Sequence, residues 1–238
     1  VPPPPPPQAL VPPTAGAPAV KEADIAIETD RELRTKFASD AAALDYLARL
    51  AAASNAIYER DVAVRLRFSY VRLWGATPAD PWSATSTTGS LDEVRAYWLN
   101  AANNMSTIAG SRDLVHFVSG KSVQGGVAYV NVLCSQSFGF AASQVHGSFD
   151  PTKPSTMWDV MVFAHETGHM FGSLHTQCYS PPVDKCYAQE SGCYDGPVVL
   201  SRGTVMSYCH LGGGIANIDL AFGNVVSARI ATSVAGAT

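Results

Sequence analysis

The chain has 238 residues, of which 47% are apolar and 15% are charged, and its formal net charge is −4. This composition is typical of one folded domain, or of a domain with a small appended subdomain, and its acidic balance excludes the basic surface that DNA or RNA would need. No apolar run approaches the roughly 20 residues that span a bilayer, and no charged n-region with an apolar h-region stands at the start, so we expect a processed chain without a membrane span.

Proline dominates the start of the chain. Residues 1–18 hold nine of the sixteen prolines, which favour polyproline II and neither helix nor sheet. We therefore interpret residues 1–22 as a linker or tail. This segment could be a plain spacer or a proline-rich ligand for an aromatic groove, and its composition favours the spacer.

From Ala23 onward, alternating and helical apolar patterns predict strands and helices. The predicted strands are residues 24–29, 62–73, 113–119, 127–133 and 138–145, and the predicted helices run from Asp40 to about Tyr58 and from Ser90 to about Met105. Asp40 is the predicted cap of the first helix, and Ser90 with Glu93 forms a capping box for the second.

Four basic side chains lie within the predicted strands. Arg65, Arg67 and Arg72 alternate with apolar residues, so we interpret them as the solvated face of a strand and not as a substrate clamp. His116 lies inside the apolar run at residues 113–119. We expect it to be packed in the core or at an edge and not to bind a metal.

The most specific pattern of the chain is H-E-x-x-H-x-x-G-x-x-H, formed by His165, Glu166, His169, Gly172 and His175. On a helix, His165 and His169 lie one turn apart and can supply two corners of a tetrahedral zinc site. Gly172 can adopt the left-handed conformation, end the helix and turn the chain so that His175 becomes the third ligand. Three neutral imidazoles leave a fourth position for water, as in catalytic zinc sites, and Glu166 can take a proton from that water.

We therefore predict one catalytic zinc ion with Glu166 as the general base. Histidines packed in a core are the alternative, but a chance match to this pattern is expected on the order of once in 100,000 chains of this length. Thr156 and Asp159 are predicted to cap the helix. No D-x-[DN]-x-[DN]-G loop is present, so nothing in the sequence supports a structural calcium ion.

Five cysteines are present: Cys134 alone, and Cys178, Cys186, Cys193 and Cys209 after the histidine motif. Residues 176–203, the cysteine loop, are rich in Pro, Gly and Ser, so disulfides are the preferred interpretation and imply an oxidising compartment. We expect a link from Cys186 to Cys193, with Cys134 tied to another cysteine, and the odd count leaves at least one thiol free or paired to another chain. A second, structural zinc is the alternative, but no C-x-x-C pair is present.

The histidine motif resembles that of the metzincin zinc metallopeptidases, and the segment TVMSY at residues 204–208 resembles their methionine turn. The resemblance implies an α/β (α+β) metzincin fold: a mixed, twisted sheet of about five strands with an antiparallel edge strand over the cleft. It implies an N-terminal subdomain at residues 23–172 that includes the zinc-binding helix. Residues 173–238 would form a small irregular subdomain with the cysteine loop, the methionine turn and a final helix at about residues 220–234.

Residues 126–130, followed by Cys134, resemble the reprolysin (adamalysin-type) branch of the metzincins. This resemblance implies that the strand at residues 127–133 is the edge along which an extended peptide adds as another strand. Met206 would lie beneath the zinc ligands without binding the metal. Tyr208 resembles a tyrosine of astacin-like and serralysin-like metzincins, which donates to the tetrahedral oxyanion or approaches the zinc; a plain structural tyrosine is the alternative.

We predict a secreted, zinc-dependent endopeptidase that cuts internal bonds of an extended protein or peptide substrate and acts as a monomer. Two other functions stay open: a narrow-specificity processing peptidase, and a catalytically idle metzincin-fold module for binding or adhesion. The intact Glu166 and histidines speak against the idle module, since binding alone would not need them. Thr176, directly after the third histidine, is not typical of the better-known branches, so the branch and its substrate preference stay open.

Overall fold

The computed structural model describes residues 19–75 and 78–237, so the proline-rich residues 1–18 lie outside the described part of the chain. Its centre is a five-stranded sheet with the strand order β2-β1-β3-β5-β4. The strands are β1 (Lys21–Thr29), β2 (Val64–Arg72), β3 (Leu114–Ser119), β4 (Gly126–Ala128) and β5 (Phe140–Gln144). β4 pairs antiparallel with β5, and the other neighbours are parallel. The mixed sheet with an antiparallel edge strand is confirmed, and β1 begins inside the predicted tail of residues 1–22.

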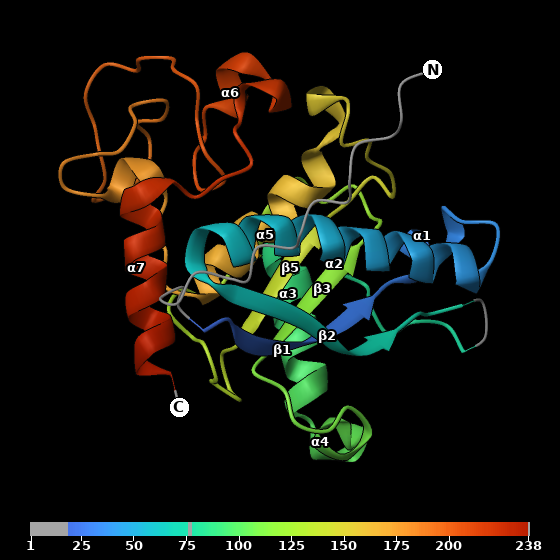
Figure 1. Cartoon of the computed structure of the whole chain (residues 1–238). Helices are drawn as coiled ribbons and strands as arrows, with labels where there is room; N and C mark the ends of the chain where they lie inside the picture. The colour runs from blue at the N-terminus through green and yellow to red at the C-terminus, as the bar shows by residue number, and fades with distance from the viewer. Residues whose placement is uncertain (1–18, 76–77, 238) are drawn as a thin grey trace, which may run out of the picture.

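Helices cover both faces of this sheet (Figure 1). They are α1 (Arg31–Thr35), α2 (Asp40–Val62), α3 (Thr87–Leu99), α4 (Met105–Ile108), α5 (Trp158–Met170), α6 (His210–Gly213) and α7 (Gly223–Gly236), with 3-10 turns at Ala101–Asn103, Pro154–Thr156, Thr176–Cys178 and Ile215–Asn217. α2, α5 and α7 share one core with the sheet, and α3 packs on the other face. Strand residues alternate between these cores: Ile25 and Ile27 join the first and Ala26 joins the second.

The edge strand is shorter than predicted, because the chain leaves the sheet after Ala128. The backbone N–H groups of Asn131 and Val132 donate to the carbonyl oxygens of His169 and Met170 at the end of α5, both at 2.9 Å. The prediction of a strand that continues to residue 133 is therefore wrong. These two hydrogen bonds fasten the segment after the edge strand to the helix that carries the histidine motif.

The predicted caps of the first two long helices are wrong. Ser39, not Asp40, caps α2 by accepting a hydrogen bond from the backbone of the first turn. Ser86 caps α3 in the same way, so the helix begins earlier than predicted and Ser90 is buried within it. Glu93 is not part of a capping box, because its carboxylate accepts from backbone N–H groups of the preceding loop.

Thr156 and Asp159 do not cap α5, which begins without a side-chain cap. The Thr156 hydroxyl instead accepts from the backbone N–H of Asp150 (3.0 Å). The carboxylate of Asp159 is fully buried and accepts from the backbone N–H groups of residues 146–148 and from the hydroxyl of Tyr46. Asp159 therefore joins α5 to α2 and to the loop before α5, a tertiary role that local spacing could not indicate.

The three arginines of β2 have two different environments. Arg65 and Arg67 are exposed and pair with acidic side chains, as predicted for a solvated face. Arg72 is mostly buried, donates to the hydroxyl of Tyr97 in α3 (3.0 Å) and lies beside the fully buried Glu28. The solvated-face interpretation is wrong for Arg72, because α3 covers this end of β2.

His116 is fully buried in β3, which confirms its predicted place in the core. Its ring stacks on Phe163 of α5 with 4.2 Å between the ring centroids. Its Nδ1 lies 3.1 Å from the hydroxyl of Thr167, and its Nε2 lies 2.8 Å from the hydroxyl of Ser143. Burial lowers the pKa of His116 to about 3, so a neutral ring joins β3 and β5 to α5.

The chain after α5 is irregular except for short turns, α6 and α7 (Figure 1). The final helix is confirmed, although it begins at Gly223 and not near residue 220. Its buried side chains, Val226, Ile230 and Val234, join the core that α2 and α5 share with the sheet. Within residues 19–75 and 78–237, no helix combines the length and the apolar character that a membrane crossing would need.

Two disulfides hold the cysteine loop: Cys178–Cys193 and Cys186–Cys209. The predicted link between Cys186 and Cys193 is wrong, because the loop folds back so that Cys193 reaches the residue at its start. The predicted link from Cys134 is also wrong. The Cys134 thiol lies 3.5 Å from a carboxylate oxygen of Asp113, near the start of β3 and away from the loop.

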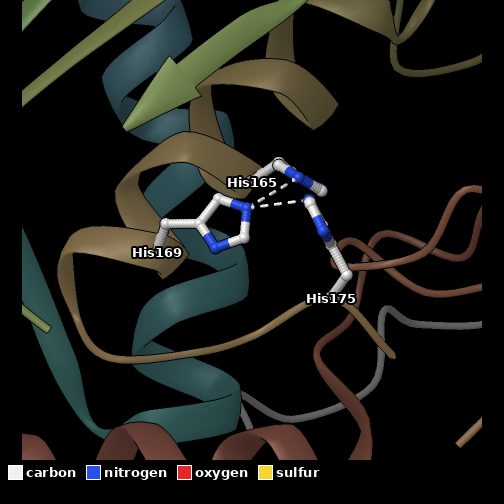
Figure 2. A group of neighbouring side chains, drawn as sticks. All are labelled: His165, His169 and His175. Atoms are coloured by element: carbon white, nitrogen blue, oxygen red, sulfur yellow. Dashed lines mark hydrogen bonds between the residues drawn. The ribbon is translucent and has the colours of Figure 1, made fainter. Parts of the chain in front are cut away.

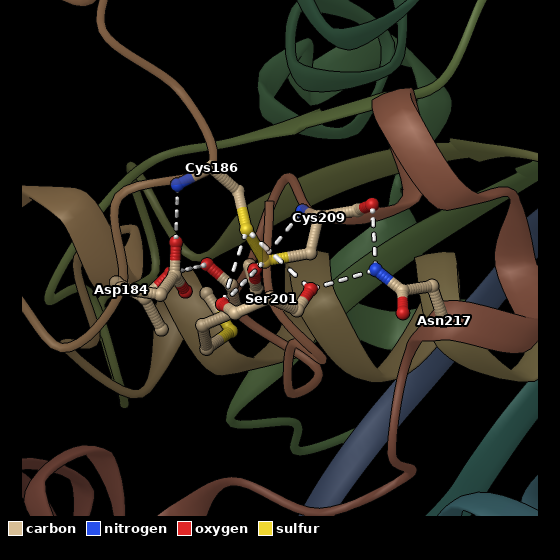
Figure 3. The surroundings of a disulfide bond; sticks show 8 residues. Asp184, Cys186, Ser201, Cys209 and Asn217 are labelled. Atoms are coloured by element: carbon tan, nitrogen blue, oxygen red, sulfur yellow. Dashed lines mark hydrogen bonds between the residues drawn. A yellow bond between two sulfur atoms is a disulfide. The ribbon is translucent and has the colours of Figure 1, made fainter. Parts of the chain in front are cut away.

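Figure 3 shows the surroundings of the Cys186–Cys209 bond. The Asn217 side-chain amide donates to the backbone carbonyl oxygens of Ser201 (2.7 Å) and Cys209 (3.1 Å). The backbone N–H of Cys186 donates to the carboxylate of Asp184 (3.1 Å). The disulfide and these polar contacts together fasten the loop to the segment that contains the predicted methionine turn.

Candidate metal centre and active site

Helix α5 places His165, Glu166 and His169 in the interior of the protein. All residues of this helix from Asp159 to Met170 are buried, and the two histidines and Glu166 keep only 4 to 6% of their surface exposed. The helix can be buried on all sides because the sheet, α2 and the C-terminal segment surround it. Its side chains are therefore fixed by close packing, which suits residues that must hold one geometry.

Gly172 ends the helix in the way that the motif predicts. Its φ of +93° lies in the region that favours glycine, and its N–H donates to the carbonyl oxygen of His169 (2.8 Å). A Cβ here would lie 2.3 Å from the hydroxyl of Ser233 in α7 and 2.7 Å from the amide oxygen of Asn131. The turn thus needs both the conformation and the small size of glycine, and it brings His175 back to the other histidines.

The three imidazole rings converge on one point (Figure 2). The Nε2 atom of His169 lies 3.1 Å from Nε2 of His165 and 3.0 Å from Nε2 of His175. A tetrahedral zinc ion with Zn–N distances of 2.0–2.1 Å separates its ligand atoms by about 3.3 Å. The spacing of the three nitrogens therefore fits a zinc ion closely.

The other ring nitrogen of each histidine identifies the tautomer. Nδ1 of His165 faces the carbonyl oxygen of Val205 (2.7 Å), and Nδ1 of His169 faces that of Ser173 (2.9 Å). Nδ1 of His175 faces a carboxylate oxygen of Glu190 (2.8 Å). These oxygens can only accept, so each Nδ1 carries the hydrogen and each Nε2 presents a lone pair.

Three lone pairs at this spacing repel one another unless a cation lies between them. Burial lowers the pKa of His165 and lowers that of His169 to about 4, which keeps both rings neutral near pH 7. Burial also lowers the pKa of His175, while Glu190 opposes this shift. Neutral imidazoles with free Nε2 atoms are the form that binds zinc.

Glu166 lies beneath the edge strand. A Cβ on Gly126 of β4 would come within 2.5 Å of its Oε1, so the carboxylate occupies the space that this glycine leaves. Burial raises the pKa of Glu166 well above its usual value. Among the residues that the structure describes, none forms a hydrogen bond with its carboxylate, which is therefore available to water or to a bound molecule.

Met206, which the methionine turn predicts beneath the zinc ligands, packs against α5. It is fully buried, and its sulfur lies 2.7 Å from where a Cβ on Gly168 would stand. Gly168, in the middle of α5, therefore allows the methionine to approach the helix. The carbonyl oxygen of Met206 also accepts from the backbone N–H of Thr176 (3.0 Å), just after the third histidine.

Tyr208 lies next to the histidines. The centroid of its ring is 4.4 Å from that of His175 and 6.1 Å from that of His165, and Tyr187 packs edge-on against it. Burial is the largest of the effects that raise its pKa, so the phenol stays protonated and can donate a hydrogen bond near pH 7.

Two hollows flank the cluster along β4. One has a volume of about 250 Å³, and its lining includes Trp158, Met161, Leu211 and His165. The other has a volume of about 210 Å³, and its lining includes Val127, Val130, Leu174 and His175. Gly126, Glu166 and Tyr208 line both hollows. The cluster therefore lies where a molecule running along the edge strand would meet Glu166 and Tyr208.

Glu190 was not predicted from the sequence as a site residue. It is one acidic residue in an irregular loop, without a periodic pattern or a motif that would distinguish it from Asp184 or Asp195. Its contact with His175 depends on how the loop folds. The alternative of a second zinc on cysteines is excluded, since Cys178 and the three other cysteines around the motif are bonded in pairs.

Comparison with known proteins finds a family model that matches most of the chain. A family model described as Reprolysin_5, metallo-peptidase family M12, matches residues 20–213. None of the curated proteins compared matches the chain. A solved structure described as "Structure of a chaperone-substrate complex" is 16% identical with a TM-score of 0.47, over 65% of this chain. The chain spans 24% of the length of that protein, and this likeness is too low to establish a shared fold.

Proposed function

The chain belongs to metallo-peptidase family M12 as a reprolysin-like metzincin, and from this we propose that it is a zinc-dependent endopeptidase that hydrolyses internal bonds of proteins. The observation that carries the proposal is the convergence of three Nε2 lone pairs within 3.0–3.1 Å, beside a buried carboxylate at the meeting point of two hollows. A binding module would have no use for this arrangement.

His165, His169 and His175 are the proposed zinc ligands. A zinc ion bound there supplies Lewis acidity, which polarises the scissile carbonyl and acidifies water. The carbonyl oxygens of Val205 and Ser173 and the carboxylate of Glu190 fix the ring orientations by accepting from Nδ1. The site would therefore be preorganised before substrate binds.

Glu166 is the proposed general base and acid. Its carboxylate takes a proton from the attacking water and then donates it to the nitrogen of the leaving amine. Burial raises its pKa, whereas a nearby cation favours the charged form, and these opposing effects keep the group able to exchange a proton near neutral pH. Its carboxylate forms no hydrogen bond within residues 19–75 and 78–237, so both oxygens are available for this transfer.

Tyr208 is the proposed second catalytic residue. Its protonated phenol lies beside His175 and lines both hollows, so it can donate a hydrogen bond to the oxyanion that forms on the attacked carbonyl. A peptide that pairs with the outer edge of β4 would pass between Glu166 and Tyr208. Side chains of the peptide would then enter the hollow on either side.

The other features of the chain suit an extracellular enzyme. The Cys178–Cys193 and Cys186–Cys209 disulfides favour an oxidising compartment, so we propose that the protein is secreted. As a separate proposal, it acts as a monomer. We also propose a subdomain boundary at residues 172–173, where Gly172 ends α5 and the irregular part begins.

The test compares the zinc-loaded wild-type chain with Glu166→Gln on a reduced, unfolded protein. We expect the wild type to cut at internal bonds. The variant should bind the same amount of zinc, but its cleavage rate should be lower by a factor of about 100 or more. The matched control is Asp195→Asn, which removes one exposed acid from the cysteine loop and should cut at the wild-type rate. Products are identified by mass spectrometry.

Each alternative predicts a different result. Cleavage of a single bond in one native protein, with no cutting of unfolded chains, would indicate a narrow-specificity processing peptidase. No cleavage of either kind by the zinc-loaded wild type would indicate an idle binding module. Equal cleavage by the wild type and Glu166→Gln would contradict the assigned role of Glu166.

A further inference from the structure

The three histidines of the cluster are oriented by different kinds of group. His165 and His169 donate from Nδ1 to backbone carbonyl oxygens, those of Val205 and Ser173. His175 donates to a side chain, the carboxylate of Glu190, which lies 15 residues later in the irregular cysteine loop. The orientation of His175 therefore depends on how well Glu190 is itself held.

Glu190 is held by a second contact, with a residue at the start of its loop. The carboxylate oxygen that accepts from His175 also accepts from the side-chain amide of Gln177 (2.8 Å). Gln177 is 1% exposed, and its backbone carbonyl oxygen accepts from the backbone N–H of Tyr194 (3.0 Å). The two segments that carry His175 and Glu190 are thus paired side by side.

The Cys178–Cys193 disulfide joins the same two segments. Cys178 lies three residues after His175, and Cys193 lies three residues after Glu190. Cys178 also donates from its N–H to the carbonyl oxygen of His175 (2.9 Å), and Cys193 donates in the same way to Glu190 (3.2 Å). The covalent bond therefore lies one turn from each member of the pair and limits their separation.

We propose that Glu190 is the positioning residue of the metal site and that the Cys178–Cys193 disulfide tunes metal affinity by holding it against His175. This inference rests on the proposed function, which places zinc on the three Nε2 atoms. Glu190 contacts Nδ1, on the far side of the ring, so it acts through His175 and not as a ligand. Among the described residues of the loop, Asp184 and Asp195 form no hydrogen bond with the histidine cluster, whereas Glu190 does, so we assign this role to Glu190.

The first experiment measures the zinc dissociation constant by competition with a chromophoric chelator. Glu190→Ala should weaken zinc binding 10- to 100-fold, since groups that orient a ligand histidine have effects of about this size. Glu190→Gln should lose less, because its amide oxygen can still accept from Nδ1. Asp195→Asn, the matched removal of an exposed acid from the same loop, should bind zinc as the wild type does.

A second readout separates positioning from a merely structural role. The thermal midpoint of the metal-free protein should be the same in Glu190→Ala, Glu190→Gln and Asp195→Asn. Weaker zinc binding by Glu190→Ala at an unchanged midpoint supports the proposal. An unchanged zinc affinity, or a loss of affinity in step with a lowered midpoint, overturns it.

A further variant tests the disulfide. Replacing Cys178 and Cys193 together by Ser keeps the carboxylate but frees the loop, so zinc binding should weaken. Adding Glu190→Ala to this variant should then cost less affinity than it does alone, because the two changes remove the same constraint. Full additivity would overturn the link to the disulfide. A wild type that binds no zinc would overturn the metal site itself, whereas equal binding by wild type and Glu190→Ala overturns this inference alone.

Discussion

Helix α5 and the cysteine loop both supply groups to the histidine cluster, but they are held by different forces. Residues 159–170 of α5 are all buried, so close packing fixes His165 and His169. The loop, residues 176–203, leaves residues 198–200 more than half exposed. Because the loop buries little apolar surface, disulfides and side-chain hydrogen bonds must hold it. The comparison teaches that covalent bonds can replace packing where a site includes an irregular segment.

The largest expected effect is the loss of stability when the Cys186–Cys209 disulfide, which holds the cysteine loop, is removed. Replacing both Cys186 and Cys209 by Ala should lower the free energy of unfolding by about 3 kcal/mol, because the bond constrains the unfolded chain between them. Chemical denaturation of the metal-free protein measures this change. Cys134→Ser, which removes a cysteine outside the loop, should change it by less than about 0.5 kcal/mol. Equal stability of the two variants would show that polar contacts such as those of Asn217 hold the loop without the disulfide.

The next effect concerns Tyr208, the proposed second catalytic residue, which lies in the segment that follows the loop. Tyr208→Phe should lower kcat by about 100-fold, or about 2.7 kcal/mol of transition-state stabilisation, with zinc content unchanged. The physical reason is the loss of one hydrogen-bond donor to the oxyanion. Steady-state kinetics on a quenched fluorescent peptide checks it. The control is Tyr187→Phe, which removes the hydroxyl of the tyrosine that packs against Tyr208. An equal kcat in both variants would make Tyr208 a structural residue only.

The smallest expected effect concerns the core around α5, where His116 is buried. The pKa of His116 is about 3 in the folded protein and near 6.5 in the unfolded chain. Between these values the unfolded chain binds more protons at this residue, so its stability contribution is complete above pH 6.5 and declines as pH falls. From pH 7 to pH 5 the loss should be about 2 kcal/mol. Denaturant unfolding of the metal-free protein at both pH values checks it. His116→Gln should remove this part of the pH dependence, and an unchanged slope in that variant would refute the assignment.

Helix α5 was also more predictable from the sequence than the cysteine loop was. His165 and His169 could be identified as a pair because helix geometry alone places them one turn apart, and Gly172 because only a glycine suits the turn. The contact of Glu190 with His175 could not be predicted, because it depends on a loop path set by disulfides whose pairing the sequence left open. The prediction that Arg72 is solvated was wrong for a related reason. Alternation of apolar and polar residues indicates a strand, but it does not indicate that helix α3 covers the end of that strand.

The shortness of β4 limits how this protein can grip a peptide. The strand has three residues, Gly126–Ala128, before the chain turns away to α5. Alternate residues of an antiparallel strand direct their N–H and C=O groups to opposite sides, so β4 can offer an incoming peptide backbone partners at about two residues. Most of the binding energy must then come from side chains that enter the hollows beside Glu166. A compact inhibitor that fills one hollow would therefore compete with a long peptide on nearly equal terms.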